Sequence, residues 1–204
     1  LHDALPIYSQ CVEAWFMHIP GLKVVIPSNP ADAKGLLKSA IRSDDPVIYF
    51  EHKKLFSMKG EVPEGELLVP IGKAKVAKEG TDLTIVSYSF YMTNVLKAAA
   101  QLDKEGIHVE CIDLRTISPL DMDTIYESLK KTKKLMIVHE AVKQGGVGAE
   151  VAARTAEEMI DYLDAPIVRL GAPFVPIPYT PPLERLVKIE PEDIIKAVKE
   201  MLGR

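Results

Sequence analysis

The sequence has few cysteines, no long apolar run and no excess of basic residues. The two cysteines, Cys11 and Cys111, are too few and too far apart for a disulfide framework or a zinc site. The longest apolar runs, such as Leu135–Val138, fall far short of the roughly 18 residues that cross a bilayer, so we expect no membrane segment. The net charge is −4, from 25 basic and 29 acidic residues, and this argues against nucleic-acid binding.

What is present is the composition of an ordinary globular protein. Apolar residues make up 47% of the 204 residues and charged residues 26%, which excludes a disordered or a collagen-like chain and allows one or two domains. The first residue is Leu1 and not Met, and no charged stretch followed by an apolar one appears after it, so we expect this start to be a truncation. Sparse cysteine predicts a reducing compartment, either a cytosol or an organelle matrix.

The first part of the chain has the pattern of a strand, a helix and a second strand. Leu22–Ile26 and Val47–Phe50 are short apolar runs of the kind found in buried strands. Between them, apolar residues recur with helical spacing after Asn29, a favourable cap, and Pro30, which is tolerated at the first helical position. Short connections between such elements predict a parallel α/β arrangement.

Residues 52–70 lose this periodicity and contain several prolines and glycines, which is typical of a connection between domains. We therefore place a boundary near residue 65, with residues 1–65 forming part of one domain and residues 66–204 forming a complete second domain.

The second domain has a stronger alternation of strands and helices, which predicts an α/β fold with a sheet covered on both faces. Ser118 is expected to cap one helix, with Pro119 at its first position. The expected strands are 83–86, 107–112, 135–138 and 167–170. The expected helices are 92–105, 118–131 and 148–162, and a last helix opens at Pro191 and ends the chain.

Two neighbouring features could carry chemistry. The glycine-rich segment Gln144–Gly148 follows a strand and opens a helix, where an α/β fold can hold a phosphate. It lacks the dinucleotide and P-loop spacings, so a tight turn built from small residues is the favoured interpretation. His139 and Glu140 end the preceding strand, and they suit either acid–base chemistry or a structural hydrogen bond.

Other sites of chemistry find little support. The remaining histidines have no metal-ligand spacing, and no G-x-S-x-G nucleophile elbow is present. Acidic pairs such as Asp44 with Asp45, and Asp121 with Asp123, are typical of helix caps and solvated surfaces.

Several long segments, in the same order, resemble the β subunit of thiamine-dependent 2-oxo acid dehydrogenases. Together they cover residues 9 to about 202, and they are Ser9–Ser28, Asp32–Arg42, Pro46–Glu51, Ile112–Asp121, Val138–Ala141, Gly145–Glu150 and Pro176–Tyr179. The resemblance implies a transketolase-like fold: the end of a pyrimidine-binding domain, followed by a complete three-layer αβα transketolase C-terminal domain.

The resemblance also implies oxidative decarboxylation of a 2-oxo acid, with acyl transfer to a lipoyl-bearing acyltransferase. The cofactor would be thiamine diphosphate shared with an α subunit, which would also hold magnesium. The family's glutamate and stacking aromatic for the pyrimidine lie outside the matched segments, so no catalytic or cofactor-binding residue is assigned here. Pyruvate is the first substrate expected. Acetoin or a branched-chain 2-oxo acid, and a non-catalytic assembly module, are the alternatives.

The expected partners are an α subunit, a second β chain and the acyltransferase, in an assembly of two α and two β chains. The loop from Pro173 to Pro182 contains five prolines and carries Phe174 and Tyr179. Because a stiff loop loses little entropy on docking, we expect it near an interface.

By the same resemblance, the turn after the first helix would surround a potassium ion, mostly through backbone carbonyls at the end of that helix. The positions carried over are Ala40, Ile41, Ser43 and Asp45. A plain helix end without an ion is the alternative.

One departure lies at the start of the matched region. The family has a histidine before the Ser-Gln pair, where this chain has Tyr8, and the stretch before it loses the resemblance. We therefore expect Leu1 to about Tyr8 to be foreign sequence.

Overall fold

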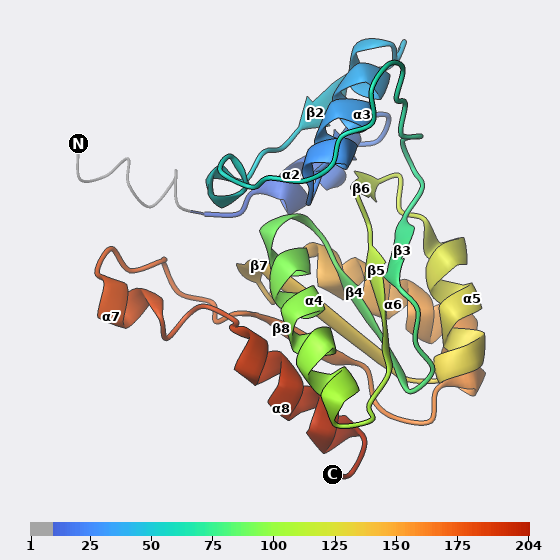
Figure 1. Ribbon diagram of the computed structural model, residues 1–204, viewed down its shortest axis with the longest axis vertical. Coiled ribbons are helices and arrows are strands. Elements are labelled where there is room, and N and C mark those ends of the chain that lie inside the picture. Colours follow the sequence, from blue (N-terminus) through green and yellow to red (C-terminus); the bar gives the residue numbers. More distant parts are fainter. Residues whose placement is uncertain (1–9) are drawn as a thin grey trace.

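The first unit is a small α/β unit at one end of the molecule (Figure 1). The structure, a computed structural model, describes residues 10–204. Strands β1 (Lys23–Val25) and β2 (Val47–Tyr49) pair in parallel, and α3 (Pro30–Ile41) connects them. This confirms the strand–helix–strand unit expected from the sequence.

Helix α3 begins as its sequence predicts. The Asn29 side chain accepts the backbone N–H of Asp32 at 2.9 Å, and Pro30 occupies the first turn, where its missing N–H costs nothing. A shorter helix, α2 (Glu13–Met17), precedes β1, and the 3₁₀ helix η2 (Lys53–Leu55) follows β2. The rest of the stretch up to Pro70 contains no helix or strand, in agreement with its lack of periodicity.

The second unit is a five-stranded sheet in the order β3-β5-β4-β7-β8. Four strands are parallel, and β3, at one edge, runs antiparallel to β5. The strands are β3 (Lys75–Lys78), β4 (Leu83–Ser87), β5 (Val109–Asp113), β7 (Leu135–Val142) and β8 (Val168–Ala172).

Helices cover both faces of this sheet (Figure 1). One face packs against α4 and α8, and the other packs against α5 and α6. Successive residues of each strand enter opposite cores, as the period of a strand requires. The helices are α4 (Ser89–Lys104), α5 (Met122–Thr132), α6 (Val147–Met159) and α8 (Pro191–Met201).

The expected helix start at Ser118 and Pro119 is wrong. Ser118 ends the strand β6 (Thr116–Ser118), and α5 begins four residues later, at Met122, with the Asp121 side chain accepting the N–H of Thr124. Asp121 also accepts the N–H of Ala74, so its carboxylate fixes both the helix and the chain beside it. A Ser-Pro-x-Asp sequence contains two residues that can cap a helix, Ser118 and Asp121, and Asp121 is the cap in the structure.

Strand β6 joins the two units. It pairs antiparallel with β1, with Ser118 opposite Val24 and Thr116 opposite Val25, and so completes the sheet β2-β1-β6. The small sheet of the first unit therefore takes its third strand from the second unit.

None of the helices within residues 10–204 combines the length and the apolar character needed to cross a membrane.

Candidate functional site

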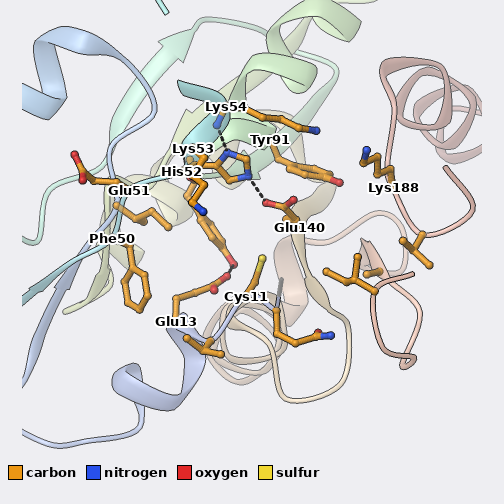
Figure 2. Close-up of a pocket in the computed structure, with 18 of the residues that line it drawn as sticks. Cys11, Glu13, Phe50, Glu51, His52, Lys53, Lys54, Tyr91, Glu140 and Lys188 are labelled. Atoms are coloured by element: carbon orange, nitrogen blue, oxygen red, sulfur yellow. Dashed lines mark hydrogen bonds and ion pairs between the residues drawn. The ribbon is translucent and has the colours of Figure 1, made fainter. Parts of the chain in front are cut away.

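A cavity of about 420 Å³ lies between the first unit and the second. Its floor is formed at the carboxyl ends of β4, β7 and β8. Its wall includes Glu51, two residues after the end of β2, and the 3₁₀ helix η2. Figure 2 shows the side chains that surround it, with acidic, basic and aromatic groups drawn from both units.

His52 connects three elements around the cavity (Figure 2). Its Nδ1 accepts the backbone N–H of Lys54 at 3.2 Å, which leaves the proton on Nε2 to be donated to Glu140 Oε2 at 2.7 Å. The ring stacks on Phe90 with centroids 5.0 Å apart. His52 therefore caps η2 and ties it to the start of α4 and to β7.

Two buried acidic groups share the cavity wall. The Tyr88 hydroxyl donates to Glu13 Oε1 at 2.8 Å, and both residues are at least 96% buried. Burial raises the pKa of Glu13 and that of Tyr88 above their ordinary values. Burial, followed by the carboxylates of Glu13 and Glu140, also raises the pKa of the Cys11 thiol, so this cysteine stays protonated and unreactive.

His139 and Glu140 do not act as a pair. Neighbouring residues of a strand point to opposite faces, and Glu140 faces the cavity while His139 is completely buried. His139 donates from Nδ1 to the carbonyl of Ala141 at 3.0 Å, and burial lowers its pKa to about 4. It is therefore a neutral structural side chain, which favours the second of the two interpretations offered by the sequence.

The glycine-rich turn packs around that buried histidine. A Cβ added at Gly148 would lie 2.7 Å from His139 Nε2, and one at Gly146 or Gly171 would lie 3.0 Å from its Cε1. Gly145 adopts φ +65°, a conformation that glycine accepts without strain. The small residues of the turn make room for an imidazole, in agreement with the favoured interpretation of a tight turn.

A polar cluster holds the two units together beside the cavity. The Ser28 hydroxyl, just after β1, donates to the buried carboxylate of Asp113 at the end of β5. The Arg115 guanidinium lies 3.2 Å from Asp32 Oδ1 on α3 and donates to the carbonyls of Lys73 and Ala74. Both ionic partners are more than 90% buried, so this ion pair is shielded from water.

We expect the stability of this contact to depend on pH through Asp113. Burial, reinforced by the nearby Asp32, raises the pKa of Asp113 to about 7, against about 3.9 in the unfolded chain. Between these values the folded chain holds the extra proton, so stability is greatest at the acidic end and falls as the pH rises through 7. Urea unfolding from about pH 5 to about pH 8 should show this loss, up to about 1.4 kcal/mol per pH unit.

Asp113→Asn, which is neutral at every pH, should remove this component. Every other titrating group is shared by the two proteins, so the difference between their stability curves isolates the carboxyl. Parallel curves for the original chain and the variant would contradict the assignment.

The turn expected to hold potassium brings together oxygen atoms around a cation of the chain itself. Lys23 Nζ lies 2.9 Å from Asp45 Oδ2 and donates to Ser43 Oγ at 3.0 Å. The carbonyl of Ala40, in the last turn of α3, accepts the N–H of Ser43, and Ile41 is the last residue of that helix. The oxygens of this turn therefore suit a positive charge, although the Lys23 ammonium holds two of them.

The sequence did not identify several residues that define the junction. No local pattern pointed to His52 or Tyr88, because their partners are 75 or more positions away. The sequence did contain an indication for Asp113 and Arg115. Charged residues are rarely buried unless they are paired, and here an aspartate ends an apolar strand two positions before an arginine.

Comparison with known proteins agrees with this architecture. Residues 72–194 match the C-terminal domain of transketolase, and residues 3–59 match the pyrimidine-binding domain of transketolase. The chain belongs to the transketolase family. The two matches lie on either side of residue 65, and the transketolase-like α/β fold is confirmed.

Similar curated proteins are β subunits of 2-oxo acid dehydrogenases. The chain is 49% identical to the β subunit of the pyruvate dehydrogenase E1 component of Rhizobium meliloti (strain 1021), over 94% of this chain and 42% of that protein. It is 49% identical to the mitochondrial counterpart from Dictyostelium discoideum, over 97% of this chain and 56% of the relative. For the β subunit of 2-oxoisovalerate dehydrogenase from Bacillus subtilis (strain 168), the identity is 46% over 98% of this chain and 62% of the relative.

The transketolase-family chain thus spans 42% to 62% of the length of these relatives. A solved split-gene transketolase, described as an inactive β4 tetramer, superposes with a TM-score of 0.77 and 26% identity. The superposition covers 94% of this chain and 60% of the other.

The segment Leu1 to Tyr8 lies outside the residues that the structure describes. The match to the pyrimidine-binding domain begins at residue 3 and so includes part of this segment. Its foreign origin stays a prediction.

Proposed function

We propose that the chain is part of the β subunit of a pyruvate dehydrogenase, which decarboxylates pyruvate oxidatively and passes the acyl group to a lipoyl-bearing acyltransferase. The observation that carries this proposal is the 49% identity to two such β subunits over almost the whole chain. The domain division near residue 65 is part of the same proposal.

The cofactor of this proposal is thiamine diphosphate, which supplies the group that accepts the 2-oxo carbon when it is bound. No carboxyl of the described residues is assigned to its pyrimidine. Glu13, the buried carboxyl of the cavity, is already bound by the Tyr88 hydroxyl. We therefore assign the cofactor and its magnesium to a site completed by an α subunit and by β-chain residues outside this sequence.

The isolated chain should not turn over pyruvate. It has no assigned cofactor contact of its own, and the diphosphate site would belong to another chain. We expect purified chain with thiamine diphosphate and magnesium to release no carbon dioxide from labelled pyruvate above a heat-treated sample. The β subunit extended to the full length of its relatives, mixed with an α subunit, should restore release.

Two results would count against this view. Carbon dioxide release by the isolated chain would show that its own residues suffice. Failure of the extended β and α pair on pyruvate, with activity on acetoin or a branched-chain 2-oxo acid, would transfer the proposal to one of those substrates. Relatives of both kinds are known, with 45% identity to an acetoin oxidoreductase β subunit and 46% to a 2-oxoisovalerate dehydrogenase β subunit.

The proposed partners are the α subunit, a second β chain and the acyltransferase. The loop between Pro173 and Pro182 ends in the short helix α7 (Pro181–Glu184) and extends away from the second domain (Figure 1). Phe174 and Tyr179 on this loop are 70% and 86% exposed, as large aromatics at an unfilled interface would be. The β4 tetramer of the related split-gene transketolase supports contacts between β chains. A non-catalytic assembly module remains the second candidate, because an exposed loop of this kind suits docking without catalysis.

A potassium ion in the turn Ala40–Asp45 is also part of the proposal. Because an ion that binds only the folded chain stabilises it, potassium about 100-fold above its Kd should raise the Tm by about 5–10 °C over lithium at equal ionic strength. Asp45→Ala should abolish the difference, whereas Asp44→Ala, a change to the exposed neighbour, should keep it. Equal melting in both salts would favour a plain helix end held by Lys23.

The location that we propose is the bacterial cytoplasm or, in a eukaryote, the mitochondrial matrix, because the relatives include bacterial and mitochondrial proteins.

A further inference from the structure

The cavity lies at the point of the second sheet where the chain reverses its direction of winding. From β4 the chain passes through α4 to β5 on one side, and from β5 it passes through α5 to β7 on the other side of β4. The carboxyl ends of β4 and β7 lie side by side, and the connections that leave them run in opposite directions along the sheet, to β5 and to β8. Open α/β sheets bind ligands at such points. Tyr88 and Ser89 after β4, and Glu140 on β7, line the cavity there.

The start of α4 is unusual in two respects. Tyr88 stands at the cap position of this 16-residue helix and makes no side-chain capping bond, so the first N–H groups have no side-chain acceptor. Ser89 adopts φ +55°, which is rare for a residue other than glycine. Ser89 lines the cavity, is 94% buried, and its hydroxyl has no hydrogen-bond partner. A strained residue with an unsatisfied buried hydroxyl is a feature of binding sites.

The charges around the cavity leave two cations unpaired within the described residues. Glu140 is bound by His52, and Glu184 is bound by Lys188 at 2.8 Å. Lys53 and Lys54 make no ion pair with any described carboxylate, and Lys54 Nζ lies 4.8 Å from the Phe90 ring centroid.

Two further carboxyls line the cavity. Glu13 is buried and bound by Tyr88, and Glu51 is exposed at the wall. Glu13 lies close to the start of α4, because Tyr88 is the cap residue of that helix, but burial raises the pKa of Glu13 and so favours its neutral form. An anion is therefore placed at the start of α4, where the helix dipole and the free N–H groups favour negative charge.

We propose that this cavity binds the phosphate group of a small phosphate monoester, with the first N–H groups of α4 and the Ser89 hydroxyl as donors and with Lys53 and Lys54 as counter-ions. The cavity volume lies within the range of small-molecule sites, roughly 300–1,000 Å³, so it has room for more than a bare phosphate. Ile26, Phe50 and Val187 supply an apolar wall for the organic part. This site is independent of the dehydrogenase activity proposed above.

The test uses the 204-residue chain with inorganic phosphate, phenyl phosphate and benzoate as probes, measured by calorimetry and by ³¹P line broadening. Phenyl phosphate should bind more tightly than inorganic phosphate because its ring contacts the apolar wall, and benzoate should bind more weakly than phenyl phosphate. Lys54→Met and Ser89→Gly should each weaken phenyl phosphate about tenfold, the usual loss for one hydrogen bond to a charged group. Glycine accepts φ +55°, so Ser89→Gly removes the hydroxyl without backbone strain.

Lys97→Met is the matched control, because Lys97 lies exposed further along α4 and does not line the cavity. It should leave the affinity unchanged. Circular dichroism of each variant confirms that it is folded before binding is measured.

Three results would overturn the proposal. These are no binding at about 10 mM phenyl phosphate, where a millimolar site is mostly filled; equal weakening by Lys97→Met; or benzoate binding as tightly as phenyl phosphate. The last result would identify a carboxylate site instead.

Discussion

Replacing Arg115 with methionine is expected to lower the free energy of unfolding by about 3–5 kcal/mol. The change keeps much of the apolar stem but leaves the buried carboxylate of Asp32 without its cation, 3.2 Å away in the structure. It also removes the donors to the carbonyls of Lys73 and Ala74. Urea unfolding of the two proteins at pH 7 measures the difference.

The control is Arg42→Met, which removes an exposed ion pair to Glu66 at the C-terminal end of α3, the helix that carries Asp32 in its first turn. Exposed pairs contribute little, so its midpoint should stay close to that of the original chain. Adding Asp32→Asn to Arg115→Met should recover part of the loss, because no uncompensated charge then remains. Equal midpoints for Arg115→Met and Arg42→Met would contradict the importance given to the buried pair.

Gly148→Ala should be the other strongly destabilising change, by about 1–3 kcal/mol or more. The new methyl group would lie 2.7 Å from His139 Nε2 and 3.0 Å from Ile137 Cγ2, and neither neighbour has free space in the core. Thermal unfolding measures the loss. Glu157→Ala, an exposed change on the same helix, should leave the Tm nearly unchanged.

The cause can be separated by a double variant. His139→Ala removes the ring that the new methyl group would meet, so in that background Gly148→Ala should cost much less. If the two losses simply add, the glycine is required for a reason other than the lack of space beside His139.

Much of the fold follows from patterns that act over short distances. Asn29 and Pro30 specify the start of α3 within four residues, and buried strands such as β4 show themselves as uninterrupted apolar runs. These signals are local, so the four strands and four helices expected in the second unit are found, although α5 begins at Met122 instead of Pro119 and β7 continues to Val142.

What the sequence did not specify depends on partners far away in the chain. Strand β6 is too short to show a period, and it is a strand only because β1 lies beside it. Asp121 caps α5 while binding Ala74, a contact that no local pattern contains. An edge strand such as β3, half exposed, has an equally weak pattern.

The candidate site was predicted less completely than the fold. The pairing of His139 with Glu140 was plausible from adjacency, but strand alternation separates them, and Glu140 instead reaches His52 across the junction. Polar contacts that close a cavity between two units depend on how those units dock, and the sequence of either unit alone does not contain that information.

The pairing of β6, from the second unit, with β1 of the first unit has a consequence for proteolysis of the protein. A single cut in the connection between residues 56 and 70 would separate the covalent chain, but the ladder between β1 and β6 and the Arg115–Asp32 pair would still join the pieces. Nicked protein would migrate as one particle until denatured. The two halves are thus joined by these contacts as well as by the connection, and a chain that ends between them would leave β1 without its β6 partner.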